Sequence, residues 1–102
     1  MARELNEVGV VGLGTMGAGI VEVLARAGLS VTAVEINDEA VARGRAHLQH
    51  STDRAVSRGK LDPADRDAIF ERIRFSSSME DLANAELVIE AVPERLDGAL
   101  GL

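Results

Sequence analysis

Three closely spaced glycines follow an apolar run near the start of the chain. The run is Val8–Val11, and the segment GLGTMG at positions 12–17 comes directly after it. Glycine costs a strand or helix roughly 0.5–1 kcal/mol relative to alanine, so three of them at one turn indicate that side chains would be in the way. Glycines with this spacing between a strand and a helix predict a turn that holds the pyrophosphate of a dinucleotide.

The remainder of the chain alternates between apolar, β-branched runs and helical patterns. We expect strands at 8–11, 30–36, 73–76 and 87–92, and longer helices at 16–27, 38–58 and 62–72. Asn37 or Asp38 can cap the second helix, and the segment SMED at 78–81 resembles a capping box for a helix of one or two turns. Strands that alternate with helices predict an α/β fold with a Rossmann-type parallel sheet, here truncated to about four strands.

The two helices between the second and third strands predict a helical-hairpin arm over approximately residues 38–72. The second of them has a strong start at Asp62-Pro63, a cap residue followed by proline in the first turn. From 38 to 60 five basic residues stand against three acids, so this segment carries +2 and the rest of the chain −8. Arg54 and Arg58 share a helix face at i, i+4 and could meet a phosphate, although for each arginine an ordinary solvated face is the alternative.

Composition narrows the class of protein. The 102 residues form one small domain or part of a larger one, and a content of 46% hydrophobic and 2% aromatic residues predicts an aliphatic core with Phe70 and Phe75 as its only rings. A net charge of −6 argues against non-specific binding to nucleic acid. The sequence has no cysteine, no signal-peptide pattern and no apolar run of membrane-spanning length. We expect a soluble, cytoplasmic protein with neither a nucleic-acid nor a membrane partner.

An acidic residue at the end of the second expected strand indicates which dinucleotide binds. Glu35 lies 18 residues beyond Gly17, near the spacing of about 20 expected for the carboxylate that grips the adenosine ribose. Such a carboxylate accepts hydrogen bonds from the ribose 2′-hydroxyl and repels a 2′-phosphate, and no arginine follows it directly. NAD is therefore favoured over NADP as the cofactor. The alternative is a tight turn in an α/β protein that binds something else.

Four stretches of the sequence together resemble the 3-hydroxyacyl-CoA dehydrogenases and, more narrowly, the bacterial 3-hydroxybutyryl-CoA dehydrogenases. They are VGVVGLGTMGAGI, VEIN, RGKL and AELVIEAVPE, and the resemblance covers residues 6 to about 97. It implies the N-terminal part of the NAD-binding domain of an oxidoreductase that interconverts (S)-3-hydroxyacyl-CoA and 3-oxoacyl-CoA.

The resemblance also implies roles for individual residues. It places the pyrophosphate at Gly12, Leu13, Gly14, Thr15, Met16 and Gly17, the adenosine ribose at Glu35, and the nicotinamide-ribose end at Ala91, Val92 and Glu94. In the family the helical arm reaches toward coenzyme A, and Ser51 and Arg58 match positions that touch it there.

The family's catalytic histidine and glutamate follow the segment EAVPE, and nothing in this chain matches them. We therefore expect that the catalytic second half of the cofactor domain and the C-terminal helical domain are absent, and that the chain alone has no catalytic residue and no activity. His47 and His50 lie in the expected arm, where we expect them to face solvent rather than to hold a metal. At the position of a lysine that approaches the cofactor in the family, this chain has Ala99.

Two alternatives stay open at this point. One is a free-standing, non-catalytic dinucleotide-binding module. The other is part of a dehydrogenase of the 3-hydroxyisobutyrate or 6-phosphogluconate type, which shares GLGTMG but commonly has Asn-Arg after the second strand. The acyl chain length and the carrier, coenzyme A or acyl carrier protein, are not determined. We also expect a homo-oligomer, because the apolar fourth strand leaves 87–89 as an unpaired sheet edge.

Overall fold

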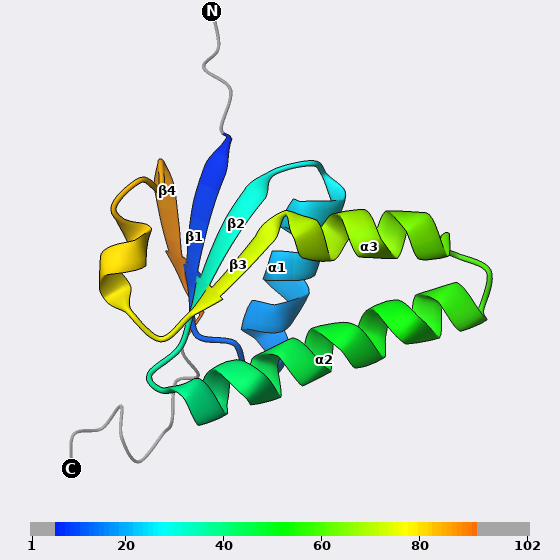
Figure 1. Ribbon diagram of the computed structural model, residues 1–102, viewed down its shortest axis with the longest axis horizontal. Helices are drawn as coiled ribbons and strands as arrows, with labels where there is room; N and C mark the ends of the chain where they lie inside the picture. Colours follow the sequence, from blue (N-terminus) through cyan, green and yellow to red (C-terminus); the bar gives the residue numbers. More distant parts are fainter. Residues whose placement is uncertain (1–5, 92–102) are drawn as a thin grey trace, which may run out of the picture.

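A four-stranded parallel sheet forms the centre of the computed structural model, which describes residues 6–91 (Figure 1). The strands are β1 (Glu7–Val11), β2 (Ser30–Val34), β3 (Ile73–Ser76) and β4 (Leu87–Glu90). The helices are α1 (Thr15–Arg26), α2 (Asp38–Ser57) and α3 (Pro63–Glu71), with a short 3₁₀ helix, η1 (Met79–Leu82), before the last strand. This order of elements confirms the predicted α/β fold with a Rossmann-type sheet.

The order of the strands across the sheet is β3-β2-β1-β4, and all neighbouring strands are parallel. The chain therefore builds outward from β1 to β2 and β3, and then returns to place β4 on the other side of β1. In the register of the sheet, Val11 lies between Val34 of β2 and Glu90 of β4. This reversal at the carboxyl end of β1 is the topological switch point, where open α/β sheets bind their ligands.

The hydrophobic core lies between the sheet and the α-helices. Its most deeply buried members are aliphatic and come from the strands and from all three helices: Val10, Val31, Ala33, Val21, Leu48 and Ile69. The rings of Phe70 and Phe75 are partly buried against this cluster. The predicted aliphatic core with two aromatic rings is therefore confirmed.

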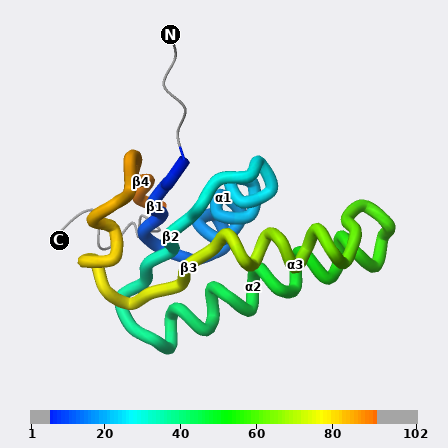
Figure 2. Tube along the Cα trace, turned by 45° about the horizontal axis from the view of Figure 1, so that its top comes forward, coloured from blue at the N-terminus to red at the C-terminus, as the bar shows by residue number. Residues whose placement is uncertain are grey.

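The helices α2 and α3 form an antiparallel pair that extends sideways from the sheet (Figures 1 and 2). This is the helical hairpin expected between the second and third strands, and it is called the arm below. Arg45 of α2 helps to attach the arm to the sheet. Its guanidinium lies 5.9 Å from the ring centroid of Phe70 on α3 and 5.3 Å from that of Phe75 on β3.

Local capping follows the expectation at one helix and departs from it at two others. The side chain of Asn37 accepts a hydrogen bond from the backbone N–H of Ala40 at 2.8 Å and so caps α2. Asp62 is the N-cap residue of α3, with proline following, but its side chain makes no capping hydrogen bond. The capping box predicted at 78–81 is wrong, because the Ser78 side chain makes no capping hydrogen bond either.

Ser76, at the end of β3, takes the place that a capping box gives to the side chain of Asp81, because it accepts from the backbone N–H of Ser78. Its hydroxyl accepts a hydrogen bond from the backbone N–H of Ser78 at 2.9 Å and donates one to the carboxylate of Asp81. Arg74 also binds Asp81, at 3.0 Å. Asp81 is thus held by β3, so it does not reach back to the start of η1 as a capping box requires.

Two of the expected strands are shorter than the apolar runs that predicted them. The second ends at Val34 instead of residue 36, since the chain turns there into the N-cap of α2, and the fourth is described as a strand as far as Glu90. Val92, Glu94 and Ala99 lie outside the described residues. Within residues 6–91, no helix combines the length and the apolar character needed to cross a membrane.

Candidate cofactor site

The turn between β1 and α1 is a close backbone contact. Gly12 has a φ of +98°, a conformation that residues with a side chain rarely adopt. At Gly17 a Cβ would lie only 1.8 Å from the carbonyl oxygen of Gly12, so α1 begins directly against the turn. Gly14 is the N-cap residue of α1 and places no side chain in front of the helix. A ligand can therefore approach the backbone closely here.

The start of α1 has the properties of an anion site. Thr15, Met16 and Gly17 form its first turn, which contains no acidic residue, and no side chain caps it. The N–H groups in the first turn of a helix have no acceptor within the helix, and the helix dipole makes this end partly positive. A pyrophosphate supplies both the acceptors and the negative charge.

Glu35 connects the end of β2 to this turn. Its Oε2 accepts a hydrogen bond from the backbone N–H of Leu13 at 2.8 Å, and its Oε1 accepts one from the N–H of Ile36 at 3.0 Å. Both bonds fix the carboxylate beside the glycine turn, and each oxygen keeps a lone pair that can accept from a ribose hydroxyl. A 2′-phosphate brought to the same carboxylate would be repelled. The residues present therefore fit NAD.

Leu13 attaches the turn to the arm. Its side chain is buried and lies against α2 at Gly44, where a Cβ would come within 2.4 Å of the Leu13 Cβ. The sequence interpretation missed Gly44 as part of the site, although a glycine inside a helical pattern is a known indication of close approach by another segment. It also missed Ile36, an apolar side chain that is 84% exposed directly after Glu35.

Ala91 lies at the same edge of the sheet, on the side of β4. Its backbone N–H donates a hydrogen bond to the carbonyl oxygen of Val11 at 2.7 Å, and its side chain is buried. The Cβ of Ala91 lies 3.4 Å from the position that a Cβ at Gly17 would occupy. The residue directly after β4 therefore lies against the first turn of α1. The structure thus brings the turn, Glu35 and Ala91 together, while the other two residues expected at the nicotinamide end fall outside the described part of the chain.

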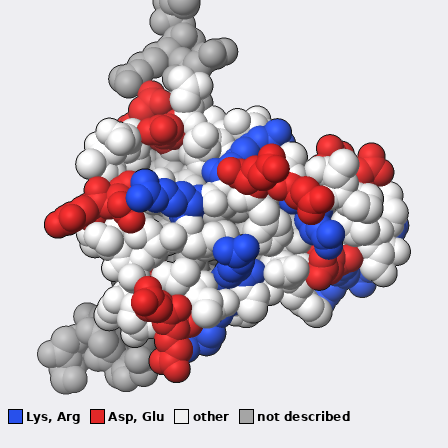
Figure 3. All heavy atoms as spheres, viewed as in Figure 1, with Lys and Arg blue, Asp and Glu red and all other residues white. Residues whose placement is uncertain are grey.

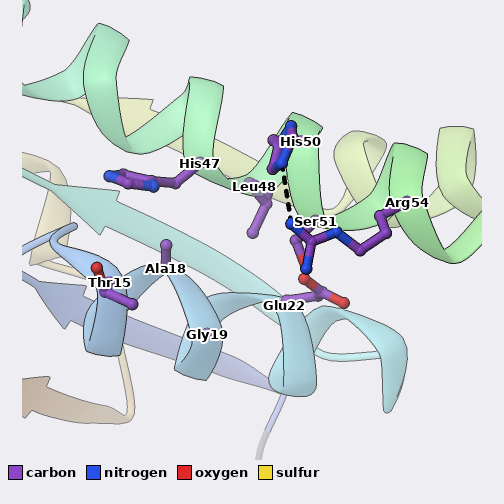
Figure 4. Close-up of a pocket in the computed structure, with 9 residues that line it drawn as sticks. All are labelled: Thr15, Ala18, Gly19, Glu22, His47, Leu48, His50, Ser51 and Arg54. Carbon is purple, nitrogen blue, oxygen red and sulfur yellow. Dashed lines mark hydrogen bonds between the residues drawn. The ribbon is translucent and has the colours of Figure 1, made fainter.

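The residues expected to touch coenzyme A lie on α2 and at its C-cap. Ser51 lines a cleft between α1 and α2 together with His47, His50 and Arg54 (Figure 4). Arg58 is the C-cap residue of the helix, one turn further along, and is not among the residues that line this cleft. Both histidines are exposed, as predicted.

These features together define a dinucleotide-binding domain of the Rossmann type. The domain has a parallel sheet with a glycine turn at its switch point, a helix N-terminus beside that turn, and a carboxylate at the end of the next strand. This class follows from the geometry alone. It leaves open which of the many dehydrogenases that share the fold this chain belongs to.

Comparison with known proteins answers that question. The family model described as "3-hydroxyacyl-CoA dehydrogenase, NAD binding domain" matches residues 7–98, and the chain belongs to this family. The family resemblance and the NAD cofactor predicted from the sequence are therefore confirmed. The match does not favour the 3-hydroxyisobutyrate or 6-phosphogluconate type of dehydrogenase.

Individual relatives agree with the family. A 3-hydroxybutyryl-CoA dehydrogenase of Mycobacterium tuberculosis is 44% identical over 94 residues, which are 92% of this chain and 33% of that protein. The crystal structure of (S)-3-hydroxybutyryl-CoA dehydrogenase PaaH1 from Ralstonia eutropha superposes with a TM-score of 0.87 at 41% identity, covering 96% of this chain and 35% of that one. For M. tuberculosis FadB2 the TM-score is 0.89 at 43% identity, with coverages of 91% and 33%. The chain spans about a third of the length of these relatives.

Proposed function

We propose that this chain provides the adenosine and pyrophosphate half of the cofactor site in an enzyme that interconverts (S)-3-hydroxyacyl-CoA and 3-oxoacyl-CoA. The observation that carries the proposal is the Glu35 carboxylate held 2.8 Å from the backbone nitrogen of Leu13, beside the glycine turn. The reaction is supported by the family and by relatives that are named 3-hydroxybutyryl-CoA dehydrogenases.

In this proposal the residues of the chain bind and orient the cofactor. The first-turn N–H groups of α1 bind the pyrophosphate, Glu35 accepts hydrogen bonds from the adenosine ribose, and the exposed Ile36 packs against the adenine. Ala91, with Val92 and Glu94 beyond the described residues, provides the nicotinamide-ribose end. When bound, NAD supplies the carbon that accepts or donates hydride.

We expect no turnover by these 102 residues. Proton transfer from the substrate hydroxyl needs a base that titrates near neutral pH, most often a histidine. His47 and His50 both lie in the middle of α2 and not at the carboxyl ends of the strands where the cofactor binds. The arm, with Ser51 and Arg58, is proposed to contact the coenzyme A part of the substrate. A cytoplasmic location is proposed as well, in keeping with a sequence free of cysteine.

A calorimetric titration with NADH, and with NADPH for comparison, tests the cofactor site. We expect saturable binding that prefers NADH. Because hydrogen bonds to a charged group contribute about 1.5–3 kcal/mol, Glu35→Ala should weaken NADH binding roughly ten- to hundredfold and reduce the preference over NADPH. Glu71→Ala is the matched control, since Glu71 is an exposed acid before β3, at the opposite edge of the sheet. Equal affinity of the wild-type chain for the two cofactors would overturn the proposal.

We also propose that the chain self-associates through the edge of the sheet. Among the described residues β4 pairs only with β1, and the side chains of Leu87 and Val88 are each 45% exposed. An exposed apolar edge strand favours pairing with another copy, and a lysine on such a strand opposes it. Light scattering over a concentration series should show a mass that rises with concentration for the wild type and stays monomeric for Leu87→Lys. A wild type that is monomeric throughout the series would refute self-association.

A further inference from the structure

Two α-helices begin at the carboxyl edge of the sheet, and their first turns differ in charge. β1 leads into α1 and β2 leads into α2, so both helices start at the edge that holds the glycine turn (Figure 1). The start of α1 has no acidic residue in its first turn and no side-chain cap. The start of α2 has both, because Asn37 caps it and Asp38 and Glu39 lie in its first turn. Of these two helix starts, that of α1 is therefore the one open to an anion.

The carboxylate of Asp38 is held in place by the sheet. The hydroxyl of Ser77, directly after β3, donates a hydrogen bond to Oδ1 of Asp38 at 2.7 Å. The residue before it, Ser76, accepts a hydrogen bond at its carbonyl oxygen from the backbone N–H of Glu35 at 3.0 Å. Ser77 thus follows a residue that is bonded to Glu35, and the negative charge of Asp38 has a fixed position relative to the carboxylate expected to bind the adenosine ribose.

The segment after Glu35 is where NADPH would differ from NADH at this site. NADPH carries a phosphate on the ribose 2′-oxygen, which in NADH is a hydroxyl that donates to such a carboxylate. This phosphate would lie beside the segment that leads from Glu35 into the first turn of α2, three residues further on. A helix start without acids would attract the phosphate. The acidic side chains over the start of α2, which Figure 3 shows, have the opposite effect.

We propose that Asp38, positioned by Ser77, is a second residue that selects NAD over NADP. Glu35 repels a 2′-phosphate directly, and Asp38 removes the attraction that the start of α2 would otherwise provide. The inference rests on the proposed function, because it assumes that Glu35 binds the adenosine ribose. An acid in the first turn of a helix commonly stabilises that helix. The bond from Ser77 gives Asp38 more than this local role, because it fixes the charge at the edge of the cofactor site.

Calorimetric titration with NADH and with NADPH tests the role of Asp38. Asp38→Asn keeps the size of the side chain and removes its charge. At low ionic strength it should raise the affinity for NADPH about fivefold, the order of effect that one charge has on another nearby in water, and change the affinity for NADH much less. Asp65→Asn is the matched control, because Asp65 is an exposed acid in the first turn of α3, which starts at the far end of the arm (Figure 1).

Combined variants separate the contributions of Glu35, Asp38 and Ser77. Glu35→Ala should keep part of the preference for NADH, and Asp38→Asn added to it should remove most of what remains. Ser77→Ala should raise the affinity for NADPH less than Asp38→Asn does. It should have no effect once Asp38→Asn is present, because a positioning residue acts only through the charge that it holds. Ser77→Thr keeps the hydroxyl and should bind both cofactors like the wild type.

The ratio of the two affinities decides the outcome. The inference is overturned if Asp38→Asn keeps the wild-type ratio or if Asp65→Asn changes it equally. It is also overturned if the gain from Asp38→Asn stays constant as salt is added, since salt screens an effect of exposed charges. A wild-type chain that prefers NADH while Asp38→Asn leaves NADPH binding unchanged refutes this inference alone. A wild-type chain without that preference refutes the proposed function as well.

Discussion

Two glycines on α1, two residues apart, should respond in opposite ways to the same substitution. Alanine at Gly17 places a methyl group 1.8 Å from the carbonyl oxygen of Gly12 and 2.8 Å from its carbon, and neither backbone atom can rotate away. Alanine at Gly19 meets nothing within 4 Å. The helix propensity of alanine is better than that of glycine by up to about 1 kcal/mol at either position.

The two effects can be weighed for each variant. Overpacking costs about 1–3 kcal/mol, and a clash with backbone belongs at the upper end of that range, so Gly17→Ala should lose about 2 kcal/mol after the propensity gain is subtracted. Gly19→Ala has only the gain, roughly 0.5–1 kcal/mol. Since each kcal/mol moves the melting midpoint of a domain of this size by about 4–8 °C, the expected changes are a decrease of about 8–16 °C and an increase of about 2–8 °C.

Thermal unfolding followed by circular dichroism measures both changes, and NADH titration adds a functional test. Gly17→Ala should also bind NADH more weakly, because the start of α1 must move away from the turn that receives the pyrophosphate. Gly19→Ala should bind NADH like the wild type. A Gly17→Ala chain that melts and binds as the wild type does would refute the assignment of Gly17 to close packing of helix on turn.

Two further substitutions test how the arm is held. Asn37→Ala removes the side chain that caps α2 and should lower the free energy of unfolding by about 1 kcal/mol. Urea denaturation measures the loss, with Asn84→Ala at an exposed asparagine as the control. Equal denaturation midpoints for the two variants would show that the cap contributes nothing. Arg45→Ala removes a guanidinium that lies over two rings and should cost about 0.5–1 kcal/mol, with Arg45→Lys losing less because a cation remains. If the lysine variant is the less stable of the two, the cation–π interpretation of this contact is wrong.

The sequence by itself determined those features that depend on a residue and its near neighbours. Gly12 must adopt a positive φ, and glycine is the residue that does so without strain. Asn37 can bond to the N–H three residues ahead, which is a property of one turn of backbone, and it does so. The alternation of apolar runs with helical patterns was also sufficient for the α/β class and for a parallel sheet, because few topologies bury such strands on both faces.

Only the tertiary structure decided which distant residues meet. Ser76 accepts from the N–H of Ser78 in place of the Asp81 side chain, because Ser76 and Arg74 of β3 hold Asp81, and spacing within the segment 78–81 carries no information about that strand. Gly44 joins the site because α2 packs on Leu13 across the sheet edge. On α2, Arg54 and Arg58 are equivalent by helical spacing. The position of α1 separates them, since it forms the opposite wall of the cleft beside Arg54 and not beside Arg58. Local sterics and hydrogen bonding act within a few residues of chain, whereas these contacts depend on how separate elements pack together.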